Sequence, residues 1–402
     1  MPLSTSDLIK RIIEESQGIS VFTTVDLGRL ISQAVQWKKY LPRIQPFYAV
    51  KANPDLNILR TLFLLGVNFD CASKGEIEMV LNLGAEPNQI IFANPAKGFD
   101  HIQYSKAKDV RLMTFDNMAE LKKILNMFPE AELVLRISSN DTMSLLPFGF
   151  KFGARREDAC QLIAACAQLK ANLVGISFHV GSGCYSSVGF IDTIHRAREM
   201  FNEAEKHGFR LTLLDIGGGF PGDTEGSITF ADIASDIGPV IDNLFPEPDI
   251  QVIAEPGRYF CTSTINVALQ VYAKRDYISR RVDPDTKECH PIKEIQYYCP
   301  DGVYGNFNNI IYDHATPICH PLVEPPLDTV LYNSTFFGPT CDSIDVIAKN
   351  ISFPPLELGD WVYFTNMGAY TTAAGSCFNG IERPPIFYKI LDQGDLKDDR
   401  NI

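Results

Sequence analysis

Short apolar runs recur along the first two-thirds of the chain, and eight of them end in residues that can do chemistry. In chain order these endings are Lys51, Asp70, Asn94, Asp116, Arg136, His179, the run Gly217, Gly218 and Gly219, and Glu255 followed by Gly257 and Arg258. Amines, carboxylates, guanidinium groups and imidazoles bind charge, form covalent linkages and move protons. Each residue alone has a structural explanation, such as helix capping by Asp70 or Asp116. Eight such endings together favour one shared site.

The runs that precede these residues predict eight strands. They are Pro46–Val50, Val67–Cys71, Gln89–Ala93, Val110–Phe115, Glu132–Ile137, Leu173–His179, Leu211–Ile216 and Ile250–Glu255. Between them lie segments whose apolar residues are three and four apart, which predicts helices over Pro54–Leu65, Glu76–Leu83, Met118–Phe128 and Glu157–Leu169. This alternation predicts the α/β class and a closed (β/α)8 barrel of the TIM type. Active sites of such barrels lie at the carboxyl ends of the strands, so the polar endings should share one rim.

The pattern changes after about residue 262. Alternating segments without intervening helical patterns follow, separated by turns rich in proline and glycine: Ile265–Tyr272, Glu294–Tyr298, Thr329–Tyr332 and Trp361–Thr365. We therefore expect two domains. Residues 26–262 should form the barrel, and residues 263–402 should form a mostly β domain that the N-terminal segment 1–25 joins.

Composition excludes several classes of function. The chain has 402 residues and a net charge of −13, whereas binding to nucleic acid needs clustered Lys and Arg. Charged residues interrupt Met1–Ser16, so it does not resemble a secretory signal, and no apolar run approaches the ~18 residues of a membrane span. The 10 cysteines form no CxxC pair, which predicts neither a zinc site nor a disulfide framework. We expect no metal and a cytoplasmic location.

The glycine run has two interpretations. Gly217, Gly219 and Gly222 fit the G-x-G-x-x-G pattern of dinucleotide-binding folds, which requires a helix to begin at once. Here Pro221 and Gly222 follow, and no helical pattern begins before about Thr229. A backbone nest that binds a phosphate group is therefore favoured, with Arg258 as a charged partner.

A phosphate cradle, a lysine and a carboxylate on one rim suit pyridoxal phosphate. This cofactor needs an amine for covalent attachment, a phosphate site, and an acid that keeps the pyridine nitrogen protonated. Lys51 could supply the amine and Glu255 the acid. Arg136 beside Asp70 could orient the lysine, and His179 could lie against the ring.

Nine motifs in the chain resemble those of eukaryotic-type ornithine decarboxylases, fold type III enzymes that use pyridoxal phosphate. The motifs are Tyr48–Asn53, Phe69–Ser73, Phe178–Gly183, Asp215–Gly222, Glu255–Tyr259, Tyr304–Phe307, Tyr312–His314, Gly338–Asp342 and Gly368–Thr371. The resemblance runs in one order from about residue 20 to residue 390. It implies the barrel with a β domain, conversion of ornithine to putrescine and carbon dioxide, and a place in polyamine biosynthesis.

The resemblance also implies a role for each residue. Lys51 would carry the cofactor, His179 would stack on its ring, and Glu255 would meet the pyridine nitrogen. The cofactor site would further include Asp70, Arg136, Ser182, Gly217, Gly218, Gly219, Pro256, Gly257, Arg258 and Tyr370. Cys341 matches the residue that protonates the product carbon. The distal ammonium of the substrate would be bound by Asp313 and Asp342, with Tyr304 and Tyr312 beside them.

The family resemblance implies a homodimer with shared active sites, in which Lys151 and Asp345 match an intersubunit ion pair. Two features depart from the family pattern. Ser343 replaces a glycine that is common in ornithine enzymes, so the run Cys341–Ser343 is closer to the Cys-Glu-Ser pattern of diaminopimelate decarboxylases, although its acid is Asp. The loop 143–150 is unusually apolar. Two alternatives remain: decarboxylation of arginine, lysine or diaminopimelate, and an inactive homologue that binds a regulatory protein.

Overall fold

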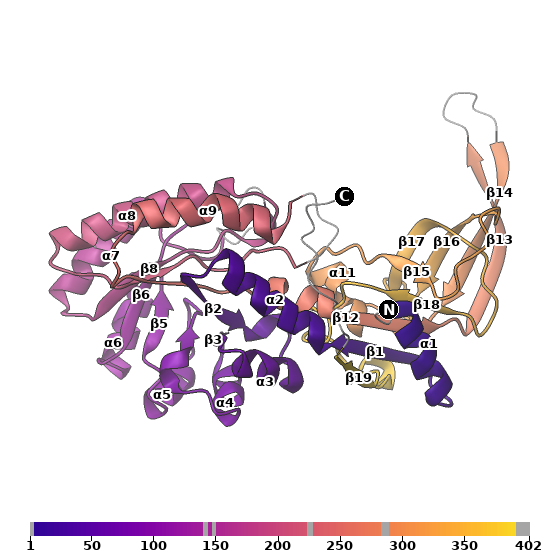
Figure 1. Ribbon diagram of the computed structural model, residues 1–402, viewed down its shortest axis with the longest axis horizontal. Coiled ribbons are helices and arrows are strands. Elements are labelled where there is room, and N and C mark those ends of the chain that lie inside the picture. The colour runs from indigo at the N-terminus through magenta and orange to yellow at the C-terminus, as the bar shows by residue number, and fades with distance from the viewer. Residues whose placement is uncertain (1–3, 140–143, 147–149, 223–227, 283–288, 391–402) are drawn as a thin grey trace. The chain divides into compact units, whose positions relative to one another are not determined.

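The chain folds into two compact units in the computed structural model, which describes residues 4–139, 144–146, 150–222, 228–282 and 289–390. The barrel unit comprises Leu30–Cys261, and the sheet unit combines Met1–Arg29 with Thr262–Ile402. Figure 1 shows the elements of both. Within the described residues, no helix is both long enough and apolar enough to cross a lipid bilayer.

The barrel unit contains the predicted closed parallel barrel. Its strands, in chain order, are β2 (Ile44–Ala49), β3 (Asn68–Cys71), β4 (Ile90–Phe92), β5 (Leu112–Phe115), β6 (Glu132–Arg136), β8 (Leu173–Ser177), β10 (Leu213–Asp215) and β11 (Gln251–Ala254). The barrel closes because β11 pairs with β2. A buried cluster that joins five strands fills the interior: Phe47, Ile91, Val134, Leu213 and Ile253. The predicted fold class is confirmed.

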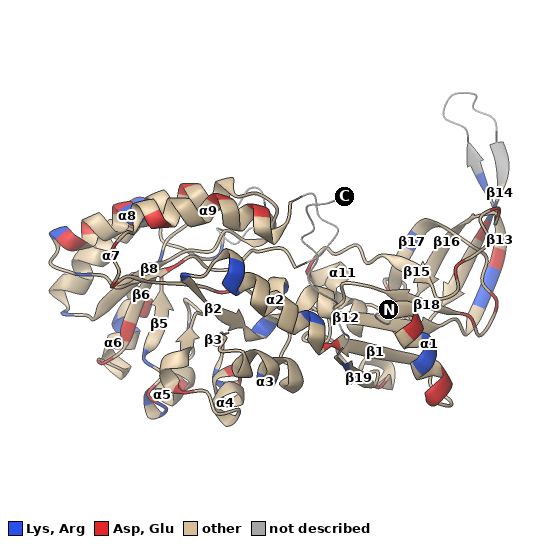
Figure 2. Cartoon of the chain, in the orientation of Figure 1, with Lys and Arg blue, Asp and Glu red and all other residues tan. Residues whose placement is uncertain are grey.

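Helices surround these strands, as Figure 1 shows. They are α2 (Leu27–Tyr40), α3 (Leu56–Leu64), α4 (Lys74–Asn82), α5 (Phe99–Ala107), α6 (Met118–Met127), α7 (Arg156–Gln168), α8 (Val188–Lys206), α9 (Phe230–Leu244) and the short α10 (Arg258–Cys261). Several begin at side chains that cap free backbone N–H groups, as Ser73 does for α4 and Asn117 for α6. Charged side chains are concentrated on these helices (Figure 2). The helices therefore present a polar outer surface and leave their apolar faces to the barrel.

A short antiparallel ribbon is formed by two segments that follow barrel strands β6 and β8 in the chain. Strand β7 (Ser144–Leu146) pairs with β9 (Ser182–Cys184). It contains part of the unusually apolar loop 143–150, of which Met143 and residues 147–149 lie outside the described part of the chain.

The sheet unit contains two sheets. The first has the order β15 (Cys319–Pro321), β18 (Trp361–Phe364), β12 (Ile265–Gln270), β1 (Val21–Asp26) and β19 (Ile386–Lys389). The second has the order β13 (Ala273–Val282), β14 (Cys289–Tyr298), β16 (Tyr332–Phe337) and β17 (Val346–Phe353). The N-terminal helix α1 (Thr5–Glu15) packs Leu8, Ile9 and Ile12 into the core beside Phe22 and Trp361. The N-terminal segment is thus built into the first sheet by β1.

One predicted strand of this unit is wrong. The alternating segment Thr329–Tyr332 is not a strand, because β16 begins only at Tyr332. The Thr329 N–H instead donates to the Pro326 carbonyl at 3.0 Å and closes a turn. Local turn formation after proline therefore overrides the apolar alternation.

Candidate active site

Lys51 and Asp70 form an ion pair at the carboxyl ends of two neighbouring strands. Strand β2 continues into the short helix η1 (Val50–Ala52), which carries Lys51, and Asp70 lies near the end of β3. Ala49, two residues before Lys51, lies opposite Asp70 in the strand register. The side chains of Lys51 and Asp70 are therefore close enough to interact. The Lys51 ammonium donates to Asp70 Oδ2. Asp70 is fully buried, whereas 39% of the lysine side chain is exposed, so the amine remains accessible at the rim.

The glycine run after β10 lies against the ends of two other strands. The Asp215 carboxylate accepts the Gly217 N–H at 2.8 Å, and Gly217 has a φ of 62°, in the left-handed region that favours glycine. A Cβ at Gly217 would lie 2.1 Å from the Phe178 carbonyl oxygen, and one at Gly218 would lie 2.6 Å from that of Glu255. Only glycine therefore allows the backbone to approach these strands so closely.

A second group of residues forms a cradle for an anion. Arg258 Nη2 donates to Ser182 Oγ at 2.8 Å, which joins α10 to β9. A Cβ at Gly257 would lie 2.9 Å from Ala52 Cβ, so the turn before α10 touches the helix that carries Lys51. Gly219 packs against the Gly181 carbonyl, where a Cβ would come within 2.7 Å. A guanidinium, a hydroxyl and close glycine backbones are the groups that bind a phosphate.

Burial controls the charge of the acids on this rim. It raises the pKa of Glu255 well above its usual value, and the carboxylates of Asp215 and Asp70 raise it further. Burial also raises the pKa of Asp215 from 3.8 to about 7. Glu255 Oε1 is buried and has no hydrogen-bond partner among the described residues. An N–H donor from a bound ligand would satisfy this oxygen.

Two of the basic side chains of the rim, His179 and Arg136, have their pKa values shifted in the opposite direction. Burial lowers the pKa of His179 well below its usual value, and the positive charges of Arg136 and Lys51 lower it further. His179 Nδ1 accepts the Gly181 N–H at 3.1 Å, as a neutral imidazole can. The lowered pKa of His179 means that its ring is neutral near pH 7. Burial lowers the pKa of Arg136 as well, although the nearby acids, Glu255 first among them, oppose this shift.

The rim fits pyridoxal phosphate. It offers an accessible amine at Lys51, a phosphate cradle at Ser182 and Arg258, and a buried carboxyl oxygen at Glu255 without a donor. Pro256 contributes through its carbonyl, which accepts the Ala49 N–H at 3.2 Å and ties β11 to β2. These residues come from three separate stretches of the chain, which the closed barrel brings together.

Two other polar strand endings have structural roles. Asn94 donates to the Ala72 carbonyl at 3.3 Å and accepts the Ala96 N–H, which shapes its own loop. Asp116 accepts the Gly153 N–H at 2.9 Å. Asp215 was given no role from the sequence, although it lies two residues before the glycine run. An acid at the last residue of a buried strand was the available signal.

The remaining predicted residues belong to the sheet unit. The Tyr304 hydroxyl donates to Asp342 Oδ2 at 2.5 Å, and this hydrogen bond lowers the pKa of Asp342. Cys341 is exposed beside it. Asp313 is buried just after the short helix α11 (Asn309–Tyr312), which ends at the exposed Tyr312. The structure thus brings together Tyr304, Cys341 and Asp342.

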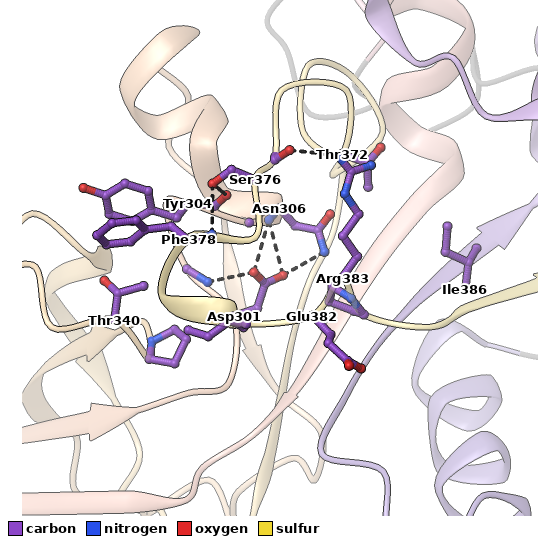
Figure 3. Close-up of a pocket in the computed structure, with 16 residues that line it drawn as sticks. Asp301, Tyr304, Asn306, Thr340, Thr372, Ser376, Phe378, Glu382, Arg383 and Ile386 are labelled. Carbon is purple, nitrogen blue, oxygen red and sulfur yellow. Dashed lines mark hydrogen bonds between the residues drawn. The ribbon is translucent and has the colours of Figure 1, made fainter.

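A pocket of the sheet unit is lined by Tyr304, the hydrogen-bond partner of Asp342 (Figure 3). Its empty volume, part of which is open to solvent, is about 600 Å³, and Tyr304, Thr340 and Phe378 are among the residues that line it. The Tyr304 and Phe378 rings stack with centroids 4.3 Å apart. Phe378, from the helical turn η5 (Phe378–Gly380), was not predicted from the sequence.

Three predicted residues remain. Tyr370 belongs to the sheet unit, where it adopts a φ of 57°, whereas the phosphate cradle belongs to the barrel unit. Lys151 is exposed on the barrel unit, with its ammonium 5.0 Å from the Phe152 ring centroid. Asp345 is 2% exposed in the sheet unit and accepts hydrogen bonds from its own unit.

Family models match most of the chain. One described as pyridoxal-dependent decarboxylase, pyridoxal binding domain, matches residues 27–262. Another, described as pyridoxal-dependent decarboxylase, C-terminal sheet domain, matches residues 258–368.

Similar proteins include both enzymes and a protein named as a regulator. The chain is 44% identical to antizyme inhibitor 2 of Xenopus laevis, over 95% of this chain and 84% of that protein. It is 41% identical to ornithine decarboxylase of Rattus norvegicus, over 96% and 84% of the two chains. A similar solved structure is the arginine decarboxylase of Paramecium bursaria Chlorella virus, with a TM-score of 0.87, 34% identity, and coverage of 96% and 100%.

Proposed function

This chain belongs to the pyridoxal-dependent decarboxylases, and from that premise we propose that it converts L-ornithine to putrescine and carbon dioxide with pyridoxal 5′-phosphate as cofactor. The observation that carries the proposal is the rim of the barrel unit. There a buried carboxyl oxygen of Glu255 lacks a donor and the amine of Lys51 is accessible. Relatives named ornithine decarboxylase support the choice of substrate.

The residues of the rim have distinct roles in this proposal. Lys51 binds the cofactor covalently, while Asp70 holds the lysine ammonium and Arg136 balances the charge of the buried acids. Glu255 would hold a proton at the pyridine nitrogen, and His179, whose pKa is lowered by burial, would lie against the ring. When bound, the cofactor would supply a sink for the electron pair that the departing carbon dioxide leaves behind.

The phosphate is bound by the cradle. Arg258 and Ser182 supply a charged and a neutral donor, and the backbone of Gly217, Gly218, Gly219 and Gly257 approaches closely. We assign Tyr370 of the sheet unit to the same phosphate on the family resemblance alone.

The sheet unit supplies the groups for the substrate and for the final proton. Asp342 and Asp313 bind the distal ammonium, with Tyr304 and Tyr312 beside them. The hydrogen bond from Tyr304 favours the charged form of Asp342, as binding of a cation requires. Cys341 delivers a proton to the product carbon.

We further propose a homodimer in which the sheet unit of one subunit completes the barrel rim of the other. Lys151 and Asp345 are the candidates for an ion pair between subunits. The Asp345 carboxylate already accepts hydrogen bonds inside its own unit, so Lys151→Ala is the variant that tests the pair without breaking those bonds.

One experiment separates the candidate activities. Release of carbon dioxide should be measured for ornithine, lysine, arginine and diaminopimelate at equal concentrations. We expect ornithine to give the highest kcat/KM. A higher value for another amino acid would reassign the substrate and leave the cofactor site unchanged.

The second candidate function is that of an antizyme inhibitor without enzyme activity, which the 44% identical relative favours. Lys51, Glu255, Cys341 and Asp342 are all present in this chain, which supports the enzyme instead. After pyridoxal phosphate is added and the unbound excess is removed, the purified enzyme should retain visible absorbance of the bound cofactor. No absorbance change and no carbon dioxide release from any of the four substrates would support the inhibitor.

A further inference from the structure

Asp345 joins two loops of the sheet unit from the inside. Its Oδ1 accepts the Val303 N–H at 2.8 Å, on the loop that carries Tyr304. Its Oδ2 accepts the Thr340 N–H at 3.0 Å and the Thr340 hydroxyl at 2.6 Å, on the loop that carries Cys341 and Asp342. One carboxylate therefore fixes both loops.

Two glycines show how tightly the backbone encloses this carboxylate. A Cβ at Gly302 would lie 2.0 Å from Asp345 Oδ1, and a Cβ at Gly338 would lie 2.2 Å from the same atom. The Gly338 N–H also donates to the Asp345 carbonyl at 2.9 Å. With an exposed fraction of 2%, the side chain has no room for an additional methylene group.

The Thr340 hydroxyl connects the buried carboxylate to Asp342. It donates its proton to Asp345, so its lone pairs are free to accept the Asp342 N–H, which lies 3.4 Å away. The Asp345 N–H donates to the Asp342 carbonyl at 3.2 Å. The backbone of Asp342 is thus held on both sides.

The other loop is fixed in the same way. Asp301 accepts the N–H groups of Gly302 and Asn306 at 2.8 and 3.2 Å, which closes the turn around Tyr304. Figure 3 shows these bonds in the wall of the pocket, which Asp301 and Asn306 line together with Tyr304 and Thr340. The Tyr304 hydroxyl then reaches Asp342 Oδ2, so both members of that hydrogen bond depend on Asp345.

We propose that Asp345 is the positioning residue for the substrate-binding carboxylate, and that it acts within its own subunit by holding the Thr340–Asp342 segment against the Tyr304 loop. This inference rests on the proposed role of Asp342 in binding the distal ammonium. It assigns Asp345 a role inside its own subunit in addition to the intersubunit ion pair proposed above.

The experiment compares four variants of the holoenzyme. Asp345→Asn places an amide N–H₂ against groups that are themselves donors, so it should break part of the network while keeping its size. Thr340→Val removes only the bridging hydroxyl. Lys151→Ala removes the candidate intersubunit partner, and Asp328→Asn is a matched change at an exposed aspartate of the same unit.

Two measurements need no substrate. In Asp345→Asn, hydrogen exchange at the Val303 and Thr340 amides should accelerate at least about tenfold. Alkylation of Cys341 by iodoacetamide, followed by mass spectrometry of its peptide, should also accelerate. Thr340→Val should change both rates in the same direction but less, whereas Lys151→Ala and Asp328→Asn should leave both unchanged.

Kinetics then connect the network to the substrate. In Asp345→Asn the KM for ornithine should rise about tenfold or more, while the visible spectrum of the bound cofactor stays unchanged. Unchanged exchange in Asp345→Asn and Thr340→Val, or equal effects of Lys151→Ala and Asp345→Asn, would overturn the proposal. If the wild type does not act on ornithine, the proposed function fails, and the exchange and alkylation rates still decide whether Asp345 holds the loop.

Discussion

At the scale of single residues, the acids Asp215 and Glu255 share one environment. Burial raises the pKa of both, and the Asp215 carboxylate raises that of Glu255 further, whereas a hydrogen bond with Glu255 lowers the pKa of Asp215. Among the described residues, one oxygen of each has no hydrogen-bond partner. A bound cation or N–H donor would therefore stabilise this pair, which is why it suits the ring nitrogen of the cofactor.

The raised pKa of Asp215, about 7, predicts a pH dependence of stability. The folded protein keeps a proton that the unfolded chain releases near pH 4, so this group makes folding less favourable as the pH rises from about 4 to 7. Asp215→Asn removes the titration and keeps an acceptor for the Gly217 N–H. Relative to the wild type, the free energy of unfolding of Asp215→Asn should therefore increase by a few kcal/mol as the pH rises from about 4 to 7, at about 1.4 kcal/mol per pKa unit.

Urea unfolding of the cofactor-free protein at several pH values measures this difference. The exposed Asp328→Asn is the control and should show no such trend. A constant difference between Asp215→Asn and the wild type over the whole range would mean that Asp215 is ionised in the folded protein.

Lys51 offers a second test at this scale, since it both pairs with Asp70 and is the proposed attachment point of the cofactor. Lys51→Ala leaves the buried Asp70 carboxylate without its ion-pair partner, and because 39% of the lysine side chain is exposed, the cost should fall below the ~3–5 kcal/mol of a fully buried pair. Lys51→Arg keeps the positive charge but removes the primary amine. Both variants should lose at least about 10²-fold in activity, while only Lys51→Ala should lose much stability.

Borohydride reduction followed by peptide mass spectrometry checks the attachment directly. We expect the mass of the cofactor on the peptide that contains Lys51 in the wild type, and on no peptide in either variant. Cofactor found on another lysine of the wild type would refute the assignment.

At the scale of elements, the turns after the strands decide how closely the site residues approach one another. The backbone from Gly217 to Gly219 passes between the ends of β8 and β11 because it has no side chains there. In the sheet unit, Gly302 and Gly338 make room for a carboxylate in the same way. Glycines at these positions therefore serve packing as well as ligand binding.

Gly217→Ala tests this point. The left-handed backbone costs about 1–2 kcal/mol for a residue with a Cβ, and overlap with the Phe178 carbonyl adds about 1–3 kcal/mol. Thermal or urea unfolding of the cofactor-free protein should show this loss. Gly75→Ala in α4, where the nearest atom would be 3.9 Å away, should change stability by no more than about 1 kcal/mol. Equal effects of the two substitutions would contradict the steric argument.

The elements themselves were largely predictable. The apolar runs located all eight barrel strands, because a strand buried on both faces has few polar residues until it reaches the rim. The observed strands end somewhat earlier than expected, as in β8, which stops at Ser177 rather than at His179. The failure at Thr329–Tyr332 has a different cause, since the turn that follows Pro326 was not recognised from the pattern.

At the scale of the whole molecule, the proposed site draws on both units. Lys51 belongs to the barrel unit, and Cys341 belongs to the sheet unit, far along the chain. In the proposed two-fold dimer each rim is completed by the other subunit, so two inactive variants with defects in different units should complement each other.

We predict that mixing equal amounts of Lys51→Ala and Cys341→Ala restores about a quarter of the wild-type activity. Random reassortment makes half of the dimers mixed, and each mixed dimer has one intact site and one site with both defects. Native mass spectrometry of differently tagged subunits should first confirm the exchange. No recovery of activity after confirmed exchange would show that each site is built within a single chain.

The sequence by itself determined the class of chemistry and the barrel. Periodicity and the polar endings of apolar runs are local properties, so they could locate the strands and place Lys51, Glu255 and Arg258 on one rim. Only the tertiary structure showed that Glu255 and Asp215 are buried together and that Asp345 joins two loops. Burial and hydrogen bonding between distant segments depend on how the chain closes on itself, and one-dimensional spacing contains no record of that closure.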